Sequence, residues 1–180
     1  MELKTPLRDE DILKLKAGDR VNLSGIVFTA RDAAHARLVD LIEKDEKLPI
    51  PLQGQVIYYV GPAPAKPGEI IGSAGPTTSY RMDPFTPVLL KHGLKGMIGK
   101  GARSKEVREA IKRYGAVYFA AVGGAAALIS RSIKRVELVA YPDLGPEAIR
   151  KLEVESFPLI VINDVYGNDL YEEGVARYRK

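Results

Sequence analysis

The hydrophobic and polar positions of this chain follow two spacings, one typical of strands and one typical of helices. Residues 20–28 alternate between the two kinds and are rich in β-forming side chains, which predicts a strand. Residues 32–44 then place Ala34, Leu38 and Leu41 on one stripe at helical spacing. We therefore predict a strand, a tight turn and a helix as the first unit of the fold.

The same rhythm continues along the chain and predicts an α/β layered sheet. The other predicted strands are residues 56–60, 96–98, 116–122, 136–140 and 159–162. The other predicted helices are residues 104–114 and 146–152. Residues 1–19 are polar and charged, although Ile12 and Leu15 could dock on the body. We therefore predict an N-terminal lead-in segment at 1–19 and a single domain at 20–180.

Composition narrows the possible function classes. A chain of 180 residues, 46% of them hydrophobic, can build a real core, and no stretch approaches the roughly 20 uninterrupted apolar residues of a membrane span. The polar N-terminus does not resemble a secretory signal, so we expect a cytoplasmic protein without a membrane partner. The absence of cysteine excludes a disulfide, a thiolate zinc site or an iron–sulfur ligand on this chain. The net charge of +4 favours an anionic partner.

A first candidate site lies where the strand at 20–28 turns into the helix. Asp32 is placed as an N-cap, and the free amides of the helix start favour an anion. Arg31 beside it offers a guanidinium fork for a carboxylate or phosphate. The alternative is a helix cap flanked by a surface arginine. His35, one turn further on, is expected to have a structural role.

A second candidate site lies in a proline-rich loop. Residues 48–87 hold eight of the 12 prolines, and a loop of this length inside a compact domain is usually functional or disordered. Within it, Gly75-Pro76-Thr77-Thr78-Ser79 combines close backbone approach with hydroxyl donors, and Arg81 adds a fixed charge. This pattern suits a ligand with oxyanions. The alternative is a turn into a helix capped by Asp83 with Pro84 at its first position.

Three further segments carry weaker signals. Gly99-Lys100-Gly101 follows a strand and could hold an anion, but it lacks the spacing of a phosphate-binding loop. Gly123-Gly124-Ala125 is explained best by close packing of a helix on the sheet. Residues 163–169 resemble a calcium loop at first glance, but their glycine is misplaced, so an Asx-rich turn is the better interpretation. The residues and their spacing thus predict an α/β domain whose basic, glycine-framed loops bind a small anion.

Together these segments closely resemble the β subunit, or C-terminal domain, of class I iron–sulfur fumarate hydratases and the related tartrate dehydratases. The resemblance extends from about residue 23 to residue 171. It is carried, in family order, by Arg31-Asp32-Ala33-Ala34-His35, Tyr59-Val60-Gly61-Pro62, Gly75-Pro76-Thr77-Thr78-Ser79, Arg81-Met82-Asp83, Gly99-Lys100-Gly101, Gly123-Gly124-Ala125-Ala126, and Asn163-Asp164 with Gly167-Asn168-Asp169.

The resemblance implies a fold, a reaction and a partner. The fold is a swivelling β/β/α three-layer domain with a mostly parallel central sheet and a smaller antiparallel sheet. The reaction is the reversible hydration of fumarate to malate. The partner is a cysteine-bearing α subunit that holds a [4Fe–4S] cluster, in an α2β2 assembly. This chain would therefore bind no cofactor and no metal of its own and would be inactive alone.

The resemblance also assigns residues. Arg31, Arg81 and Lys100 would bind the substrate carboxylates. Thr77 matches the residue that the family proposes for proton abstraction, a role that needs cationic neighbours because a threonine hydroxyl is a poor base. Asp32 and Thr78 would be supporting contacts.

Several alternatives stay open at this point. The substrate could be tartrate or another hydroxylated dicarboxylate, because these reactions use the same cationic residues. Tyr80 stands where the family commonly has a small residue, so it could narrow the pocket. A stand-alone small-anion or nucleic-acid binding module is the alternative from another class, but dispersed basic residues without an aromatic stacking motif argue against nucleic acid. A purely structural subunit is the third alternative.

Overall fold

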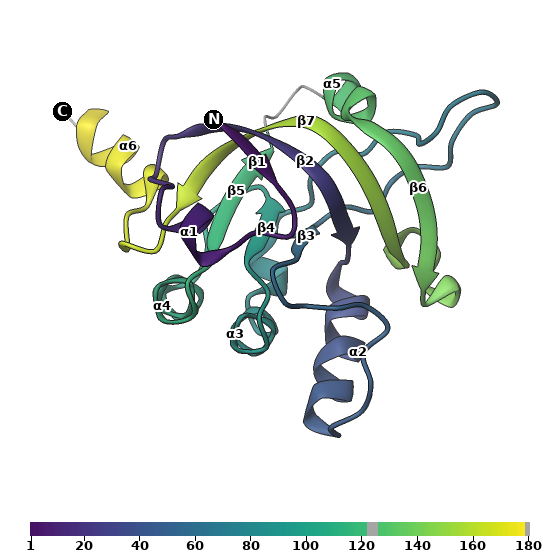
Figure 1. The fold of residues 1–180 in the computed structure, drawn as a ribbon, viewed down its shortest axis with the longest axis horizontal. Helices are drawn as coiled ribbons and strands as arrows, with labels where there is room; N and C mark the ends of the chain where they lie inside the picture. Colours follow the sequence, from purple (N-terminus) through teal and green to yellow (C-terminus); the bar gives the residue numbers. More distant parts are fainter. Residues whose placement is uncertain (122–125, 179–180) are drawn as a thin grey trace.

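The computed structural model describes residues 1–121 and 126–178 and has the α/β organisation predicted from the sequence (Figure 1). Within these residues, seven strands form one mixed sheet: β1 Glu2–Lys4, β2 Arg20–Thr29, β3 Val56–Tyr58, β4 Gly96–Gly99, β5 Val117–Ala121, β6 Ile133–Ala140 and β7 Ile149–Asn163. The α-helices are α1 Asp9–Ile12, α2 Asp32–Glu43, α3 Thr86–Lys91, α4 Lys105–Tyr114, α5 Ala126–Ser132 and α6 Leu170–Tyr178. Two 3₁₀ helices, η1 Ser79–Met82 and η2 Pro142–Glu147, complete the elements.

The sheet closes on itself. Its strand order is β1-β2-β3-β4-β5-β7-β6, and the strands β1 to β5 are parallel to one another. The long strand β7 is antiparallel to β5, β6 and β2, and the β2–β7 pairing joins β2, β3, β4, β5 and β7 into a ring. In Figure 1, β2 and β7 arch together above the shorter strands. The antiparallel strands thus belong to the same sheet as the parallel ones, rather than to a separate smaller sheet.

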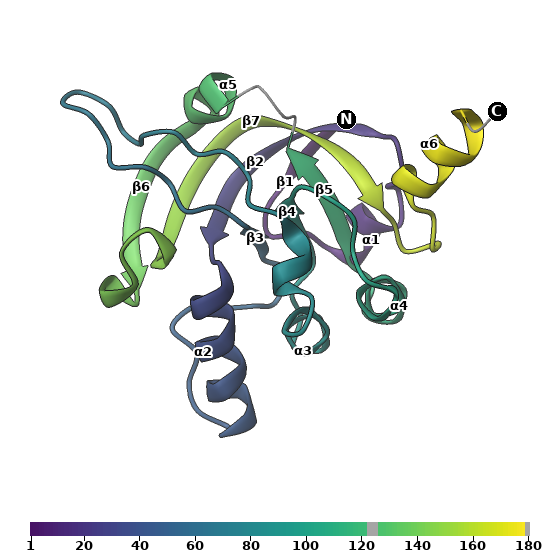
Figure 2. The ribbon, with the colours of Figure 1, turned by 180° about the vertical axis from the view of Figure 1, so that it is seen from behind.

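Side-chain alternation divides the core in two. Val56 and Tyr58 of β3 join the apolar cluster formed by side chains of β2, β4, β5 and β7. Ile57 and the following Tyr59 point the other way and join the cluster that holds α2, α3 and α4 against the sheet. Figures 1 and 2 show these three helices on one side of the sheet. This arrangement leaves the ends of β2, β3 and β4 free to carry loops.

The N-terminal segment 1–19 is built into this core. Strand β1 pairs in parallel with β2, and Leu3 lies opposite Leu23. Ile12 and Leu15, the two residues predicted to dock on the body, are fully buried. Among the residues that the structure describes, no helix is both long enough and apolar enough to cross a membrane.

The helix predicted at 146–152 is wrong. Residues 142–147 form η2, and the chain enters β7 at Ile149. Leu152 pairs with Val27 of β2 on one side and with Val136 of β6 on the other. Pairing on both edges satisfies the backbone in the extended form, and this tertiary context overrides the helical spacing of the apolar residues.

The other predicted elements are confirmed with shifts at their ends, of which the largest is at β7: the strand predicted at 159–162 is only its last part, because β7 begins at Ile149. The helix predicted at 104–114 is α4, where Ser104 caps the start by accepting from the Val107 amide at 3.3 Å. It stops at Gly115, whose φ of 62° is the left-handed conformation that glycine adopts without strain. The glycine pair at 123–124, interpreted from the sequence as helix packing, lies outside the described residues.

Candidate active site

The loops that carry the predicted site residues leave the sheet at one edge. Strands β2, β3 and β4 are parallel neighbours, so their carboxyl ends lie side by side. Arg31 follows β2, Gly61 follows β3, and Lys100 comes directly after β4. The edge at the carboxyl ends of parallel strands is the usual place for ligands in α/β folds.

The threonine segment lies between the ends of β3 and β4. The Thr77 amide donates to the Tyr59 carbonyl at 2.7 Å, and the Ser79 amide donates to the Lys100 carbonyl at 2.9 Å. Thr78 and Lys100 form an isolated parallel β-bridge. The structure therefore brings Thr77, Thr78 and Lys100 to the same edge of the sheet, where Lys100 is exposed and both threonines are half-buried.

Asp32 joins the two arginines of the site. Its Oδ1 lies 3.0 Å from Nε of Arg81, and its Oδ2 lies 3.8 Å from Nη2 of Arg31. The sequence interpretation of Asp32 as an N-cap is wrong, because α2 begins at Asp32 itself, Arg31 takes the cap position, and no side chain caps there through a hydrogen bond. The carboxylate is instead turned toward the two arginines.

The anion expected at the start of α2 comes from the protein itself. Glu147, at the end of η2, places Oε2 where it accepts from the Ala33 amide at 3.2 Å. Its Oε1 lies 3.3 Å from Nη2 of Arg31. Glu147 was missed in the sequence because 114 residues separate it from Ala33 and no local pattern marks the contact. It stabilises the helix start and the arginine together.

Arg31 runs close over a glycine backbone. A Cβ atom added at Gly61 would lie 2.9 Å from Nη1 of Arg31, so a side chain there would displace the guanidinium. The Arg31 Nε and Asp32 Oδ2 atoms are buried without a hydrogen-bond partner in the described part of the chain. Buried polar atoms normally have partners, so these two leave hydrogen-bonding capacity at the site.

His35 has the structural role that the sequence favoured. Its ring is fully buried, with Nδ1 2.8 Å from the Arg31 carbonyl and the edge of the ring against Tyr59. Burial lowers the pKa of His35 to about 4, although the hydrogen bond to Arg31 opposes the shift. The imidazole is therefore neutral near pH 7 and donates from Nδ1, which supports the turn that presents Arg31.

The predicted helix cap at Asp83 is also wrong. Helix α3 begins at Thr86, after Phe85, and Asp83 directly follows η1. The Asp83 carboxylate accepts instead from Arg103 Nε and from the Ser104 amide, both at 2.7 Å. An ion pair with the buried Arg103 outweighs a local cap because an unpaired charge would be costly there.

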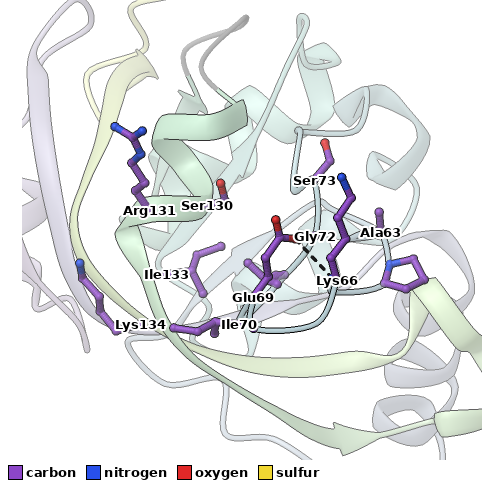
Figure 3. A pocket seen from close by; sticks show the side chains of 13 residues that line it. Ala63, Lys66, Glu69, Ile70, Gly72, Ser73, Ser130, Arg131, Ile133 and Lys134 are labelled. Carbon is purple, nitrogen blue, oxygen red and sulfur yellow. Dashed lines mark hydrogen bonds between the residues drawn. The ribbon is translucent and has the colours of Figure 1, made fainter.

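A cavity of about 600 Å³ in the described part of the chain lies away from these residues. It lies between the arm at residues 63–73 and the junction of α5 with β6 (Figure 3). Lys66, Arg131 and Lys134 line it, whereas Thr77 and the three predicted clamp cations do not. The candidate site is an exposed edge on this chain rather than an enclosed pocket.

The fold and this edge define an α/β domain whose loops bring basic side chains and a pair of threonines to the carboxyl ends of parallel strands. The chain belongs to the fumarase C-terminus family, whose model matches residues 1–174. Among its relatives, a putative L(+)-tartrate dehydratase subunit beta from Methanocaldococcus jannaschii is 44% identical over 93% of this chain and 89% of the relative. The class I anaerobic fumarate hydratase of Escherichia coli is 40% identical over 98% of this chain. Fumarate hydratase 2 of Leishmania major is 39% identical over 98% of this chain.

The lengths of these relatives differ in an informative way. The chain spans 33% of the Escherichia coli relative and 32% of the Leishmania major relative, but most of the Methanocaldococcus jannaschii subunit. The fold described above thus corresponds to one part of a longer polypeptide in some relatives and to nearly a whole subunit in another.

Proposed function

We propose that this chain is the β part of a class I iron–sulfur fumarate hydratase, a hydro-lyase that interconverts fumarate and malate. Family membership and the names of the relatives support the proposal. The observation that carries it is that Arg31, Arg81, Lys100 and the threonine pair lie on loops at the same edge of the sheet, with the two arginines linked through Asp32, because a dicarboxylate needs several fixed cations and a proton-transfer group in one place.

In this proposal the two arginines bind the substrate carboxylates. A guanidinium matches a carboxylate in a bidentate geometry, and Asp32 fixes the position of Arg81 through Nε, away from the terminal nitrogens. Glu147 holds Arg31 through Nη2, and the absence of a side chain at Gly61 leaves room for the Arg31 guanidinium. Lys100 adds an exposed positive charge beside the threonines. Asp32 and Thr78 act as supporting contacts.

Thr77 is the proposed proton-transfer residue. Its amide is tied to the Tyr59 carbonyl, which fixes where its hydroxyl can point. In dehydration, Thr77 would act as an alkoxide that takes the proton from the carbon next to a carboxylate and becomes a hydroxyl; in hydration, the hydroxyl would give that proton back and become an alkoxide again. The neighbouring cations would stabilise the negative charge of the alkoxide.

The residues of this chain do not fit an iron–sulfur cluster. The sequence has no cysteine, and among the described residues no three His, Asp or Glu side chains gather as metal ligands. We place a [4Fe–4S] cluster on a cysteine-bearing α partner, where it would supply Lewis-acid chemistry. An α2β2 assembly, a cytoplasmic location and swivelling of this domain against its partner belong to the same proposal. The longer polypeptides of the two fumarate hydratase relatives agree with such a second part.

A tartrate dehydratase is the second candidate function. It is favoured by the 44% identity to a relative with that name and by the similar length of the two chains. Tyr80, which is exposed next to Arg81, is one place where the two substrates could be distinguished.

The proposal is tested by anaerobic reconstitution of this chain with its cysteine-bearing partner and a restored cluster. Fumarate hydration and tartrate dehydration are then assayed side by side. Fumarate turnover that requires both chains supports the proposal, and Arg81→Ala should raise KM and lower kcat. Arg37→Ala is the matched control, because Arg37 is a surface arginine of α2 that pairs with Asp143 and makes no ion pair with the proposed site residues. Tartrate turnover alone would favour the second candidate, and a loaded complex inactive on both would overturn both.

A further inference from the structure

A fully buried arginine lies directly beneath the candidate site. The Arg103 side chain has no solvent exposure. Its Nε donates to Asp83 at 2.7 Å, and its Nη2 donates to the Thr86 hydroxyl at 2.8 Å. Its Nη1 lies 3.3 Å from the Tyr59 hydroxyl. One guanidinium thus contacts three segments: the end of β3, the residue after η1, and the start of α3.

Two aromatic rings enclose this guanidinium. Its central carbon lies 5.3 Å from the ring centre of Tyr59 and 4.9 Å from that of Tyr118. Burial alone would lower the pKa of Arg103, but Tyr59, the Asp83 carboxylate and Tyr118 together raise it. The charge is therefore retained in the interior. Its contacts are with the segments that carry the proposed clamp.

The Tyr118 hydroxyl extends the network to the threonine segment. It donates to the Gly101 carbonyl at 2.8 Å and lies 2.8 Å from the Ser79 hydroxyl. A phenol has one proton, so Ser79 is the donor in the second contact. Gly101 follows Lys100, and Ser79 follows Thr78, so one hydroxyl joins the two strands of the Thr78–Lys100 bridge from below.

Gly99 makes this approach possible. A Cβ atom there would lie only 2.0 Å from the Ser79 hydroxyl oxygen and 2.9 Å from the Tyr59 ring. The Ser79 side chain therefore occupies the space that a side chain at residue 99 would need. The threonine segment can pass this close to β4 only because residue 99 is glycine.

We propose that Arg103 and Tyr118 are positioning residues that hold the Thr77 to Arg81 segment in register with the Lys100 loop. They touch no substrate. Arg103 fixes the far end of the segment through Asp83 and the near end through Tyr59, whose carbonyl holds the Thr77 amide. Tyr118 fixes the middle through Ser79. The proposed consequence for catalysis rests on the proposed function of Thr77, Arg81 and Lys100, whereas the register itself does not.

Two conservative variants test the network. Arg103→Lys keeps the charge but loses the planar fork that reaches Asp83 and Thr86 together. Tyr118→Phe keeps the ring against Arg103 and removes only the hydroxyl. The matched control is Arg108→Met. Like Arg103, Arg108 pairs with a buried carboxylate, that of Asp169 at 3.3 Å, but it is only partly buried and its contacts do not include the threonine segment.

The first measurement is amide hydrogen exchange in the full chain, which needs no activity. We expect the Thr77 and Ser79 amides to lose protection at least tenfold in Arg103→Lys and Tyr118→Phe, while amides in the middle of β2 exchange at wild-type rates. Arg108→Met should leave both site amides unchanged. Wild-type protection of these amides in folded Arg103→Lys and Tyr118→Phe would overturn the proposal.

The second measurement is kinetics in the complex with the α partner. A misplacement of about 1 Å can reduce turnover on the order of 100-fold. We expect kcat to fall and KM to rise in Arg103→Lys and Tyr118→Phe, with both values within twofold of wild type in Arg108→Met. Loosened amides with unchanged kinetics would overturn the positioning role. The variants could also lose amide protection while the wild-type complex, with its cluster restored, fails to hydrate fumarate. That result would support the positioning of the threonine segment by Arg103 and Tyr118 and would overturn the proposed function instead.

Discussion

The Oδ1 atom of Asp32 lies 3.0 Å from Nε of Arg81, so a carboxylate in the first turn of α2 holds an arginine of the threonine loop. The same carboxylate faces Arg31 at 3.8 Å. One anion between two cations keeps both guanidinium groups at the edge of the sheet and reduces their mutual repulsion. The geometry of the proposed clamp thus depends on acidic residues as well as on basic ones.

Replacement of Asp32 with Asn should weaken substrate binding. Arg81 is about half exposed, so solvent screens the ion pair and its contribution is about 1 kcal/mol. We therefore expect KM for the dicarboxylate to rise about fivefold in the assembled enzyme. Asp40→Asn is the control, since Asp40 pairs with Lys44 on the exposed side of the same helix. Equal KM values in both variants would contradict the role of Asp32.

Two variants of Glu147 should separate its effects on the helix and on Arg31. Glu147→Gln keeps an oxygen for the Ala33 amide and removes the charge that faces Arg31. Glu147→Ala removes both contacts and should also cost about 1 kcal/mol of stability, or about 2–4 °C in Tm. KM should rise in both variants, but Tm should fall clearly only in the second. Glu109→Ala, on the exposed side of α4, controls for loss of a surface carboxylate.

The sequence predicted which residues share this edge of the sheet better than it predicted what holds them there. Arg31, Asp32 and Lys100 could be found because they closely follow predicted strands, and Thr77 because it lies in a loop rich in glycine and hydroxyl groups. Glu147 could not be found, because its partners lie more than 100 residues away and arrive only through the pairing of β7.

Arg103 was missed for a related reason. In sequence it is one basic residue before a helix, where an exposed side chain is the ordinary expectation. Arg103 can be buried because it pairs with the Asp83 carboxylate, which sequence reasoning assigned to a helix cap. The same weakness of local patterns explains the wrong helix at 146–152, where apolar residues at helical spacing are paired on both edges as a strand.

Replacement of Gly99 with Ala should strain the threonine segment. The new methyl group would overlap the Ser79 hydroxyl and crowd the Tyr59 ring. Overpacking of this kind typically costs about 1–3 kcal/mol. Urea unfolding should therefore show a lower midpoint with an unchanged slope. Gly174→Ala, where an added Cβ meets nothing within 4 Å, should leave the midpoint unchanged or raise it. A wild-type midpoint for Gly99→Ala would show that Ser79 moves away freely.

Protonation of His35 should destabilise the chain in mildly acidic solution. Burial lowers the pKa of His35 to about 4 in the folded state, against 6.5 for an ordinary histidine. As pH falls from about 6.5 to about 4, the unfolded chain binds a proton that the folded chain does not, so stability declines by up to about 3 kcal/mol. Above pH 6.5 both states carry neutral histidine, and the contribution is constant.

The pH dependence can be assigned to this residue by urea unfolding between pH 4.5 and 8. His35→Gln removes the titrating group, so its free energy of unfolding should fall less steeply below pH 6.5 than that of the wild type. His92→Gln is the matched control, because the exposed His92 makes the same contact through Nδ1 to a carbonyl four residues earlier. Its pH profile should follow the wild type. If His35→Gln follows the wild type as well, acidic destabilisation does not arise from the histidine behind Arg31.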